Sequence, residues 1–486
     1  MRGPLVAFVF GIAVFAARGG AAVADPRDAA WMSGDVAWHH LGWLFYRAEA
    51  WTWPLGRTAH FPEPVGTAIG FVDAVPLAAL LFKALDPLLP AGFQYLGPWL
   101  ALSFGLQAFF GARIASLYSG SPVTQALGGA VFAVAPPLLE RMGHVALASH
   151  WLLLAALEVA LDPRSPRWRA LAVVGVAAGV HPYLLAMAFA LCAPRLGLAG
   201  IAGAGLLVAL EGWAFGYLDG ADWAVDGWGR YGADVLALVN PMARSRLPVG
   251  WDAEAEGFAW LGPGVLLAVP LAARPPRRVA AVCVLLAAFS ISDQVRVGGR
   301  QVLSGDFDWF GFGGPFQTSG RFVWPLHYLV VAAAIAGVCR FRHGGLALAV
   351  VLALQVADRP VWRWDPGPPT HHLRAPAWDL AVGSYRHLAL DPPQLGCCPS
   401  EDRIDPVPFG YLAARLGLTV DSARLARDRC AAEVAYCASP VREADTVWVL
   451  GPSRRGRRPD LTCGRLDGWE VCVQRGRDDA FARALR

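Results

Sequence analysis

Long apolar runs with almost no charge inside them recur through the first 357 residues of this chain. A helix needs roughly 20 mostly apolar residues to cross a bilayer, and several of the runs approach that length. The composition agrees, because 55% of the 486 residues are hydrophobic and only 16% are charged, a balance outside that of soluble domains. The runs cover residues 4–17, 97–112, 123–139, 145–157, 170–191, 196–210, 258–273, 279–289, 322–338 and 344–357. They predict an all-α polytopic membrane domain with about eleven transmembrane helices.

Arginine-bearing turns between the runs predict the orientation, since short basic loops favour the cytoplasmic side. These turns are residues 111–122, 162–169, 192–197, 274–278 and 340–343. Segments between them then face outward, including a large first loop at 25–96 and the whole chain after about residue 358. This alternation requires that residues 68–90 do not span the bilayer. Asp73, Lys83 and Asp86 would be costly in lipid, which supports a re-entrant or surface segment there.

The N-terminus has two interpretations. Met1-Arg2 followed by an apolar run to Ala17 resembles a secretion signal, and the Ala-rich stretch before Asp25 resembles a cleavage site. The many later runs favour an uncleaved first helix instead.

A separate domain begins at about residue 358, where Asp, Arg, Pro and Cys become frequent. Residues 358–486 are numerous enough for an independent core. Alternating segments at 446–450 and 469–473 predict strands. We therefore expect a small α/β or α+β domain outside the cytoplasm, following a membrane domain at 1–357.

Cysteines are concentrated in this C-terminal domain: Cys397, Cys398, Cys430, Cys437, Cys463 and Cys472. Outside the cytoplasm, six cysteines favour disulfides, with fifteen alternative pairings. A zinc site is the competing interpretation, although no Cys-x-x-Cys spacing is present. The other three cysteines, Cys192, Cys283 and Cys339, are interpreted as small apolar residues of membrane helices.

Titratable residues gather in two outward segments. The first outward loop contains the carboxylates Asp35, Glu63 and Asp73 together with the adjacent histidines His39 and His40. Interfacial aromatic residues explain most of the tryptophans there, but not these groups. The second cluster, expected on the same side, contains Arg141, His144 and His150.

Two further features bear on metal and membrane chemistry. The loop at 217–257 carries Asp219, Asp222, Asp226 and Asp252. Their spacing matches no known cation-binding loop. The sequence therefore predicts no metal or other cofactor, and a divalent cation bound by this loop is the alternative. Glu211 interrupts an apolar run and should face the protein interior or an aqueous cavity, either in a structural pair or in a site.

Several motifs stand out along the chain: Gly34-Asp-x-x-Trp-His-His-Leu-Gly-Trp43, Arg141-Met-Gly-His-x-x-Leu-x-x-His-Trp151, Tyr231-Gly-Ala-Asp-Val-Leu-Ala-Leu-Val-Asn-Pro241, Glu256-Gly-Phe-Ala-Trp-Leu-Gly262 and Phe316-Gln-Thr-Ser-Gly-Arg-Phe-Val-Trp-Pro325. Together they resemble an uncharacterised bacterial membrane family placed in the GT-C superfamily of polyprenyl-phosphate-dependent glycosyltransferases. The resemblance covers residues 1 to about 360 and is looser in the tail. It implies a class of reaction and not a substrate.

In that class an acid of the first outward loop serves as general base, while cations stabilise the departing lipid phosphate. By position Asp35 is the expected base, with Glu63 or Asp73 in reserve. Arg321, at the outward start of a helix, is the expected phosphate ligand, with Arg141 and His144 as its partners.

Structural roles compete with each of these assignments. Asp35 could pair with Arg47 or cap the helix that follows it. His39 and His40 are more often structural or interfacial than catalytic. Arg321 could be an anchor whose guanidinium reaches the membrane surface.

The sequence therefore predicts a bacterial inner-membrane glycosyltransferase that moves a sugar from a lipid-linked donor to a surface glycan or lipid. The alternatives are a transporter of lipid-linked saccharides and an envelope assembly protein. A transporter should carry polar groups across the midplane of several helices, often in repeated halves. This chain has few such groups and shows no internal repeat. A net charge of +4 gives no reason to expect nucleic acid as a partner.

Overall fold

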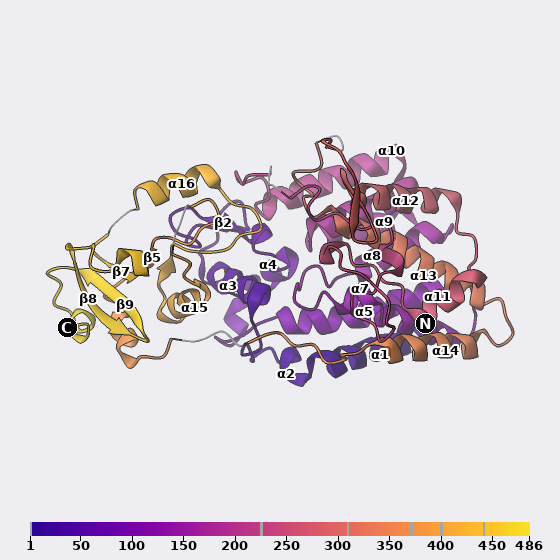
Figure 1. Cartoon of the computed structure of the whole chain (residues 1–486), viewed down its shortest axis with the longest axis horizontal. Helices are drawn as coiled ribbons and strands as arrows, with labels where there is room; N and C mark the ends of the chain where they lie inside the picture. Colours follow the sequence, from indigo (N-terminus) through magenta and orange to yellow (C-terminus); the bar gives the residue numbers. More distant parts are fainter. Residues whose placement is uncertain (1, 224–226, 309–310, 369–372, 399–401, 441–442) are drawn as a thin grey trace. The chain divides into compact units, whose positions relative to one another are not determined.

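The computed structural model describes residues 2–223, 227–308, 311–368, 373–398, 402–440 and 443–486 (Figure 1). The chain divides into two compact units, each built from segments distant in sequence. The helical unit comprises Met1–Ala29, Gly92–Glu211 and Trp223–Asp365. The mixed unit comprises Ala30–Ala91, Gly212–Asp222 and Pro366–Arg486.

Helices make up most of the helical unit. Its α-helices are α1 (Arg2–Gly19), α2 (Ala21–Ala24), α5 (Leu96–Ser116), α6 (Pro122–Ala133), α7 (Pro136–Leu139), α8 (Trp151–Leu161), α9 (Arg167–Ala178), most of α10 (Pro182–Ala214), α11 (Pro263–Ala268), α12 (Arg277–Ile291), α13 (Trp324–Val338) and α14 (Gly344–Asp358). Short 3₁₀ helices are η3 (Ala237–Val239), η4 (Ala255–Gly257), η5 (Val269–Leu271) and η6 (Ser319–Val323). The strands β3 (Gln294–Val297) and β4 (Arg300–Ser304) form an antiparallel hairpin.

Three helices in the described residues are long and apolar enough to cross a membrane, at Arg2–Gly19, Pro182–Ala214 and Ser319–Val338. Shorter apolar helices lie at Trp151–Leu161 and Gly344–Asp358. The prediction of about eleven transmembrane helices is therefore not supported. What holds is a helix-rich chain with three candidate spans.

Proline and glycine explain why apolar runs do not become equally long helices. The run at 123–139 is divided because α6 ends at Ala133 and α7 starts at Pro136. Proline fits the first turn of a helix but not its interior. The run at 258–273 yields only the six residues of α11 before Pro270 of η5. Within α10 the backbone bends at Gly197, whose φ of 65° lies outside the helical region.

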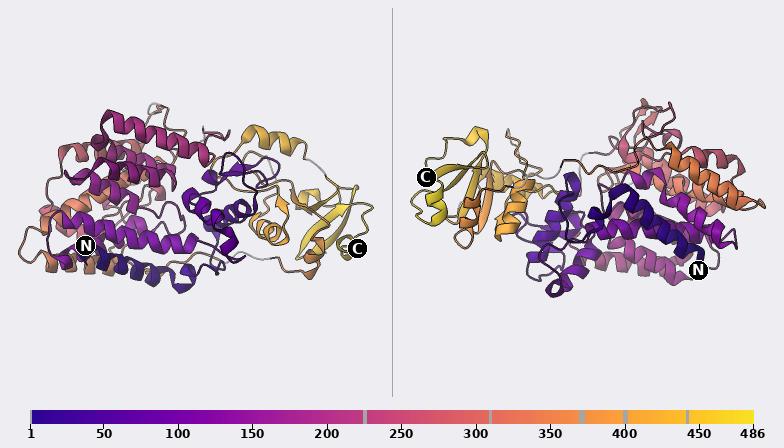
Figure 2. Two further views of the ribbon diagram at one scale, coloured as in Figure 1. Left: turned by 180° about the vertical axis from the view of Figure 1, so that it is seen from behind. Right: turned by 90° about the horizontal axis from the view of Figure 1, so that it is seen from below.

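Helices α1 and α5 run side by side and pack through glycine (Figures 1 and 2). A Cβ on Gly11 would lie 2.2 Å from the carbonyl oxygen of Phe104. Small residues permit this close backbone approach between apolar helices. The Phe15 and Phe104 rings, with centroids 5.9 Å apart, fill the adjoining space.

The mixed unit is built on a five-stranded sheet with the order β6-β5-β7-β9-β8. β5 pairs in parallel with β6 and β7, while β9 is antiparallel to both β7 and β8. Its elements are α3 (Gly34–Ala48), β1 (Arg57–Thr58), β2 (Thr67–Ala68), η1 (Ile69–Phe71), α4 (Pro76–Ala84), η2 (Asp86–Leu88), η7 (Pro376–Ala381), β5 (His387–Asp391), α15 (Val407–Leu416), β6 (Thr419–Val420), α16 (Cys430–Ala438), β7 (Thr446–Leu450), η8 (Pro452–Arg454), β8 (Leu461–Leu466), β9 (Trp469–Gln474) and α17 (Ala480–Ala484). The expected sheet-containing C-terminal domain is confirmed.

Residues 30–91 pack against the C-terminal residues within this unit. A Cβ on Gly410 of α15 would lie 2.9 Å from the side chain of Leu41 in α3, so these helices are in close contact. The backbone N–H of Glu63 donates to the carbonyl of Val420 in β6 at 2.8 Å. At nine residues, α4 is too short to span a bilayer.

All six C-terminal cysteines form disulfides, as Cys397–Cys430, Cys398–Cys437 and Cys463–Cys472. Cys430 and Cys437 are seven residues apart on α16, which places them on one face of that helix. Cys463 and Cys472 are directly opposite each other in the β8–β9 pair. The three remaining cysteines are free.

Candidate functional site

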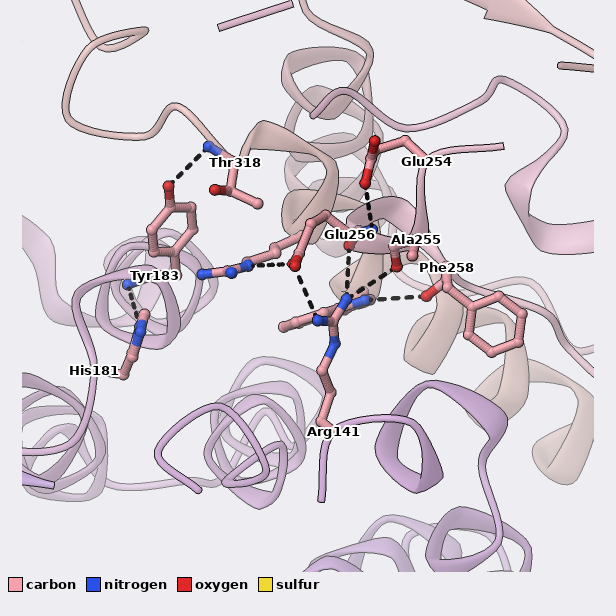
Figure 3. A network of polar contacts seen from close by, with 10 residues as sticks. Arg141, His181, Tyr183, Glu254, Ala255, Glu256, Phe258 and Thr318 are labelled. Atoms are coloured by element: carbon pink, nitrogen blue, oxygen red, sulfur yellow. Dashed lines mark hydrogen bonds and ion pairs between the residues drawn. The ribbon is translucent and has the colours of Figure 1, made fainter. Parts of the chain in front are cut away.

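Two arginines share one oxygen of one glutamate in the helical unit. Nε of Arg321 lies 2.8 Å from Oε2 of Glu256, and Nη1 of Arg141 lies 3.0 Å from the same atom. Nη2 of Arg141 also donates to the carbonyl of Ala255 at 3.0 Å (Figure 3). Both arginine side chains are about nine-tenths buried, at 11% and 12% exposed. We call Arg141, Glu256 and Arg321 the arginine bridge.

Two guanidinium groups dominate the electrostatics of Glu256 in the arginine bridge. Burial by itself would raise the pKa of Glu256, but the guanidinium groups of Arg321 and Arg141 outweigh it and lower that pKa to about 2. The carboxylate is therefore ionised at neutral pH. Within the bridge, two guanidinium groups thus hold one ionised carboxylate.

Close backbone packing positions the bridge. Arg321 belongs to η6 and Glu256 to η4, two short 3₁₀ helices. A Cβ on Gly320 would lie 2.8 Å from the backbone nitrogen of Gly257, so only glycine lets η6 approach η4 this closely. Arg141 lies in the turn that follows α7.

Aromatic rings flank both guanidinium groups. The guanidinium carbon of Arg321 lies 4.8 Å from the ring centre of Tyr183, and that of Arg141 lies 5.2 Å from the ring of Trp324. Tyr183 is fixed because its hydroxyl accepts a hydrogen bond from the backbone N–H of Thr318 at 2.9 Å. Such stacking restricts the arginine rotamers and keeps their orientation.

His144, an expected partner of Arg321, and His150 both lie near the aromatic rings that flank the bridge. His144 is in edge contact with His181, with ring centres 5.6 Å apart, and His181 in turn contacts Tyr183 at 5.5 Å. His150 is fully buried, 4.3 Å from the ring of Trp324. Its Nδ1 forms a 2.6 Å hydrogen bond with the Tyr328 hydroxyl.

A second glutamate beside the bridge also pairs with two arginines, one at each of its carboxylate oxygens. Glu140 pairs with Arg244 at 2.9 Å and with Arg359. Burial would raise the pKa of Glu140, but Arg359 and Arg244 lower it overall. Residues 140 and 141 thus each take part in a shared ion pair.

The three expected base candidates belong to the mixed unit and have different surroundings. Asp35, in the first turn of α3, is exposed and lies 3.5 Å from Arg424. It neither caps α3, whose N-cap is Ser33, nor pairs with Arg47, which binds Asp86 instead. Glu63 pairs with a histidine, as described below. Asp73 is half-buried and adopts a positive φ of 51°.

His39 and His40 are buried in the core of the mixed unit. Burial lowers the pKa of His40 to about 3, and Nδ1 of its ring hydrogen-bonds the Tyr411 hydroxyl at 3.0 Å. Burial also lowers the pKa of His39 to about 4, against the opposing charge of Asp73. Neutral, packed imidazoles at these positions fit the structural alternative.

The remaining candidates have the following surroundings. Asp219 pairs with Arg429 at 2.9 Å, and Asp222 accepts from the backbone N–H of Cys430 at 2.8 Å, so both bind the start of α16. Asp226 lies outside the described residues, and Asp252 is exposed. Oε2 of Glu211, in the last turn of α10, is buried without a hydrogen-bond partner among the described residues.

The mixed unit contains a cavity of about 140 Å³ at the amino ends of its parallel strands. Its lining includes Glu63, His387, Thr419, Asp421 and Glu443. Nδ1 of His387 contacts Oε2 of Glu63 at 2.9 Å, and the hydrogen bond to Glu63 raises the pKa of His387 against the effect of burial. Burial raises the pKa of Asp421 to about 7.

A family model described as "Domain of unknown function (DUF6311)" matches residues 8–360. The chain belongs to the DUF6311 family. A second model, the DUF6311 C-terminal domain, matches residues 377–474. No curated protein and no solved structure matches this DUF6311 chain.

Three residues of these sites have no role in the sequence-based prediction. Glu256 is the first residue of the motif that ends at Gly262, but a single carboxylate in a loop does not indicate which residues it pairs with. Tyr183 follows His181-Pro182, and nothing in that stretch of sequence indicates a contact with Arg321. His387 carries no motif, and only the strand pairing places it beside Glu63.

Proposed function

We propose that this DUF6311 protein is a membrane glycosyltransferase whose arginine bridge binds the phosphate of a polyprenyl-linked sugar donor. The observation that carries the proposal is the sharing of one Glu256 oxygen by two buried guanidinium groups. Guanidinium forks match the geometry of phosphate oxygens.

The location of the bridge agrees with a lipid-linked donor. Arg321 stands in the first turn of the candidate span Ser319–Val338. A polyprenyl chain occupies the bilayer, so its phosphate lies at the level where such a span begins. The rings of Tyr183 and Trp324 beside the bridge provide apolar surface next to the charge.

In the proposed reaction the acceptor hydroxyl attacks the anomeric carbon, and the bond from that carbon to the phosphate oxygen breaks. The phosphate leaves with the bonding electron pair, and Arg141 and Arg321 stabilise its negative charge. A carboxylate takes the proton of the hydroxyl. Asp35 is the proposed base because its carboxylate is exposed beside Arg424 at 3.5 Å, whereas Glu63 is engaged by His387.

The acceptor in this proposal is a glycan or lipid outside the cytoplasm. The three disulfides of the mixed unit favour an oxidising compartment. Asp35 belongs to the same unit as these disulfides.

Purified protein in lipid, supplied with a radiolabelled polyprenyl-phosphate sugar and a cell-envelope extract, tests the proposal. Label should move from the lipid to an extract component, and Arg321→Ala should abolish the movement. Binding of the donor without any transfer, or its passage across the bilayer unchanged, would contradict the proposal and favour a carrier of lipid-linked saccharides.

A further inference from the structure

The amino ends of β5 and β7 bring an imidazole and two carboxylates together in the mixed unit. His387 is the first residue of β5, and it is paired in register with Thr446, the first residue of β7. Glu443 and Asp445 immediately precede β7 and are two residues apart. His387, Glu443 and Asp445 each offer one ligand atom, and the three atoms all lie within 4.8 Å of one another.

The spacing matches a first coordination shell. Nε2 of His387 lies 3.3 Å from Oε2 of Glu443. Zinc holds nitrogen and oxygen ligands at roughly 2.0–2.2 Å, so two ligands of a tetrahedral ion lie about 3.3 Å apart. An ion between these two atoms therefore needs little rearrangement.

Glu63 supplies the support that a metal-binding histidine requires. Its Oε2 lies 2.9 Å from Nδ1 of His387, on the opposite side of the ring from Glu443. Thr419 Oγ1 lies 2.6 Å from the same Nδ1. The Glu63 carboxylate and the Thr419 hydroxyl beside Nδ1 favour the proton at Nδ1, which leaves a free lone pair on Nε2, as is usual in metal-ligating histidines.

The cavity adds room and negative charge. It has a volume of about 140 Å³ and is lined by Glu63, Asp421 and Glu443 as well as His387. No lysine or arginine is among the described residues that line it. A cation held by His387 would thus face a space large enough for water or a small ligand at its open coordination positions.

We propose that His387, Glu443 and Asp445 bind a divalent cation of the zinc type, with Glu63 orienting His387. Imidazole nitrogen together with carboxylate oxygen suits Zn²⁺, whereas Ca²⁺ takes oxygen ligands alone. This site lies within the mixed unit and does not depend on the donor reaction proposed above.

Isothermal titration of the full-length, tag-free protein in detergent with Zn²⁺ tests the site. Wild type should bind one Zn²⁺ that Ca²⁺ in excess does not displace. His387→Ala should abolish binding, and Glu63→Gln should weaken it about 10-fold, since loss of a supporting carboxylate costs roughly 10–100-fold in metal affinity.

His60→Ala is the matched control, because His60 also pairs with a glutamate, Glu49 at 2.6 Å, in the same unit. Its Zn²⁺ affinity should equal that of wild type. Circular dichroism shows whether each variant is folded, and Glu443→Gln with Asp445→Asn provides a second test in case His387→Ala unfolds. Absence of Zn²⁺ binding in wild type, or undiminished binding in folded His387→Ala or in the double variant, would overturn the proposal.

Discussion

Arg321 donates from Nε to Oε2 of Glu256 at 2.8 Å, an ion pair between two short 3₁₀ helices that are 65 positions apart in the chain. Because Arg141 contacts the same oxygen, removal of the carboxylate leaves two buried guanidinium groups facing each other. Both the stability and the binding properties of the helical unit should depend on this contact.

Acid should destabilise the protein through Glu256. A carboxyl whose pKa is lowered on folding stabilises the native state above its unfolded value, near 4.5, and loses this effect as the pH falls through the folded value, near 2. A shift of this size corresponds to about 3 kcal/mol. The thermal midpoint in detergent should fall between pH 5 and pH 2.5, and it should fall less steeply in Glu256→Gln.

Glu254→Gln is the control for this measurement. Among the described residues, Glu254 accepts one local hydrogen bond, from the N–H of Glu256 at 3.4 Å. The thermal midpoint of the Glu254→Gln variant should depend on pH as that of wild type does. Equal slopes for wild type and Glu256→Gln would show that the bridge does not carry this part of the stability.

Six of the nine cysteines should resist alkylation because they form disulfides, and the other three should react. Alkylation of denatured, unreduced protein should modify only Cys192, Cys283 and Cys339, and reduction should expose all nine. Mass spectrometry of the alkylated peptides measures this directly. More than three modified thiols without reductant would refute the pairing, and the expected location in an oxidising compartment would lose its support.

Asp35→Asn should remove most sugar transfer, by about 10² to 10⁴ in rate, because the amide cannot accept a proton. Folding should hardly change, since the pair with Arg424 is exposed on both sides and such pairs stabilise little. Asp379→Asn is a matched control, because Asp379 is an exposed aspartate in an exposed pair with Arg415 at 2.6 Å. Transfer at the wild-type rate by Asp35→Asn would move the base to Asp73 or Glu63.

Sequence patterns within short segments correctly predicted strands of the C-terminal sheet. Alternating apolar residues at 446–450 and 469–473 indicated strands, and β7 and β9 lie there. Hydrophobic runs alone predicted about eleven transmembrane helices, whereas three helices among the described residues are long and apolar enough to be candidate spans. Hydrophobicity does not register that proline at 136 and 263 starts new short helices, or that glycine at 197 bends α10.

Contacts between distant residues account for what the sequence did not predict. The expected phosphate ligands Arg141 and Arg321 do lie together, but Glu256 joins them through a fold that no spacing rule encodes. Likewise, the segment 30–91 packs on α15 and β6 because Leu41 fits against Gly410 and Glu63 bonds to Val420. A pattern within either segment cannot specify that pairing.

Equilibrium binding of undecaprenyl phosphate, followed by native mass spectrometry, tests the arginine bridge most directly. Arg321→Lys keeps the charge but loses the planar fork, and a lost charge-assisted hydrogen bond is worth roughly 10-fold or more in affinity. Arg169→Lys is the matched control, because Arg169 shares Glu158 with Arg113 in a second two-arginine pair, at 2.9 Å and 2.6 Å. The account predicts binding weakened about 10-fold in Arg321→Lys and unchanged in Arg169→Lys. Equal affinity in wild type and folded Arg321→Lys would contradict it.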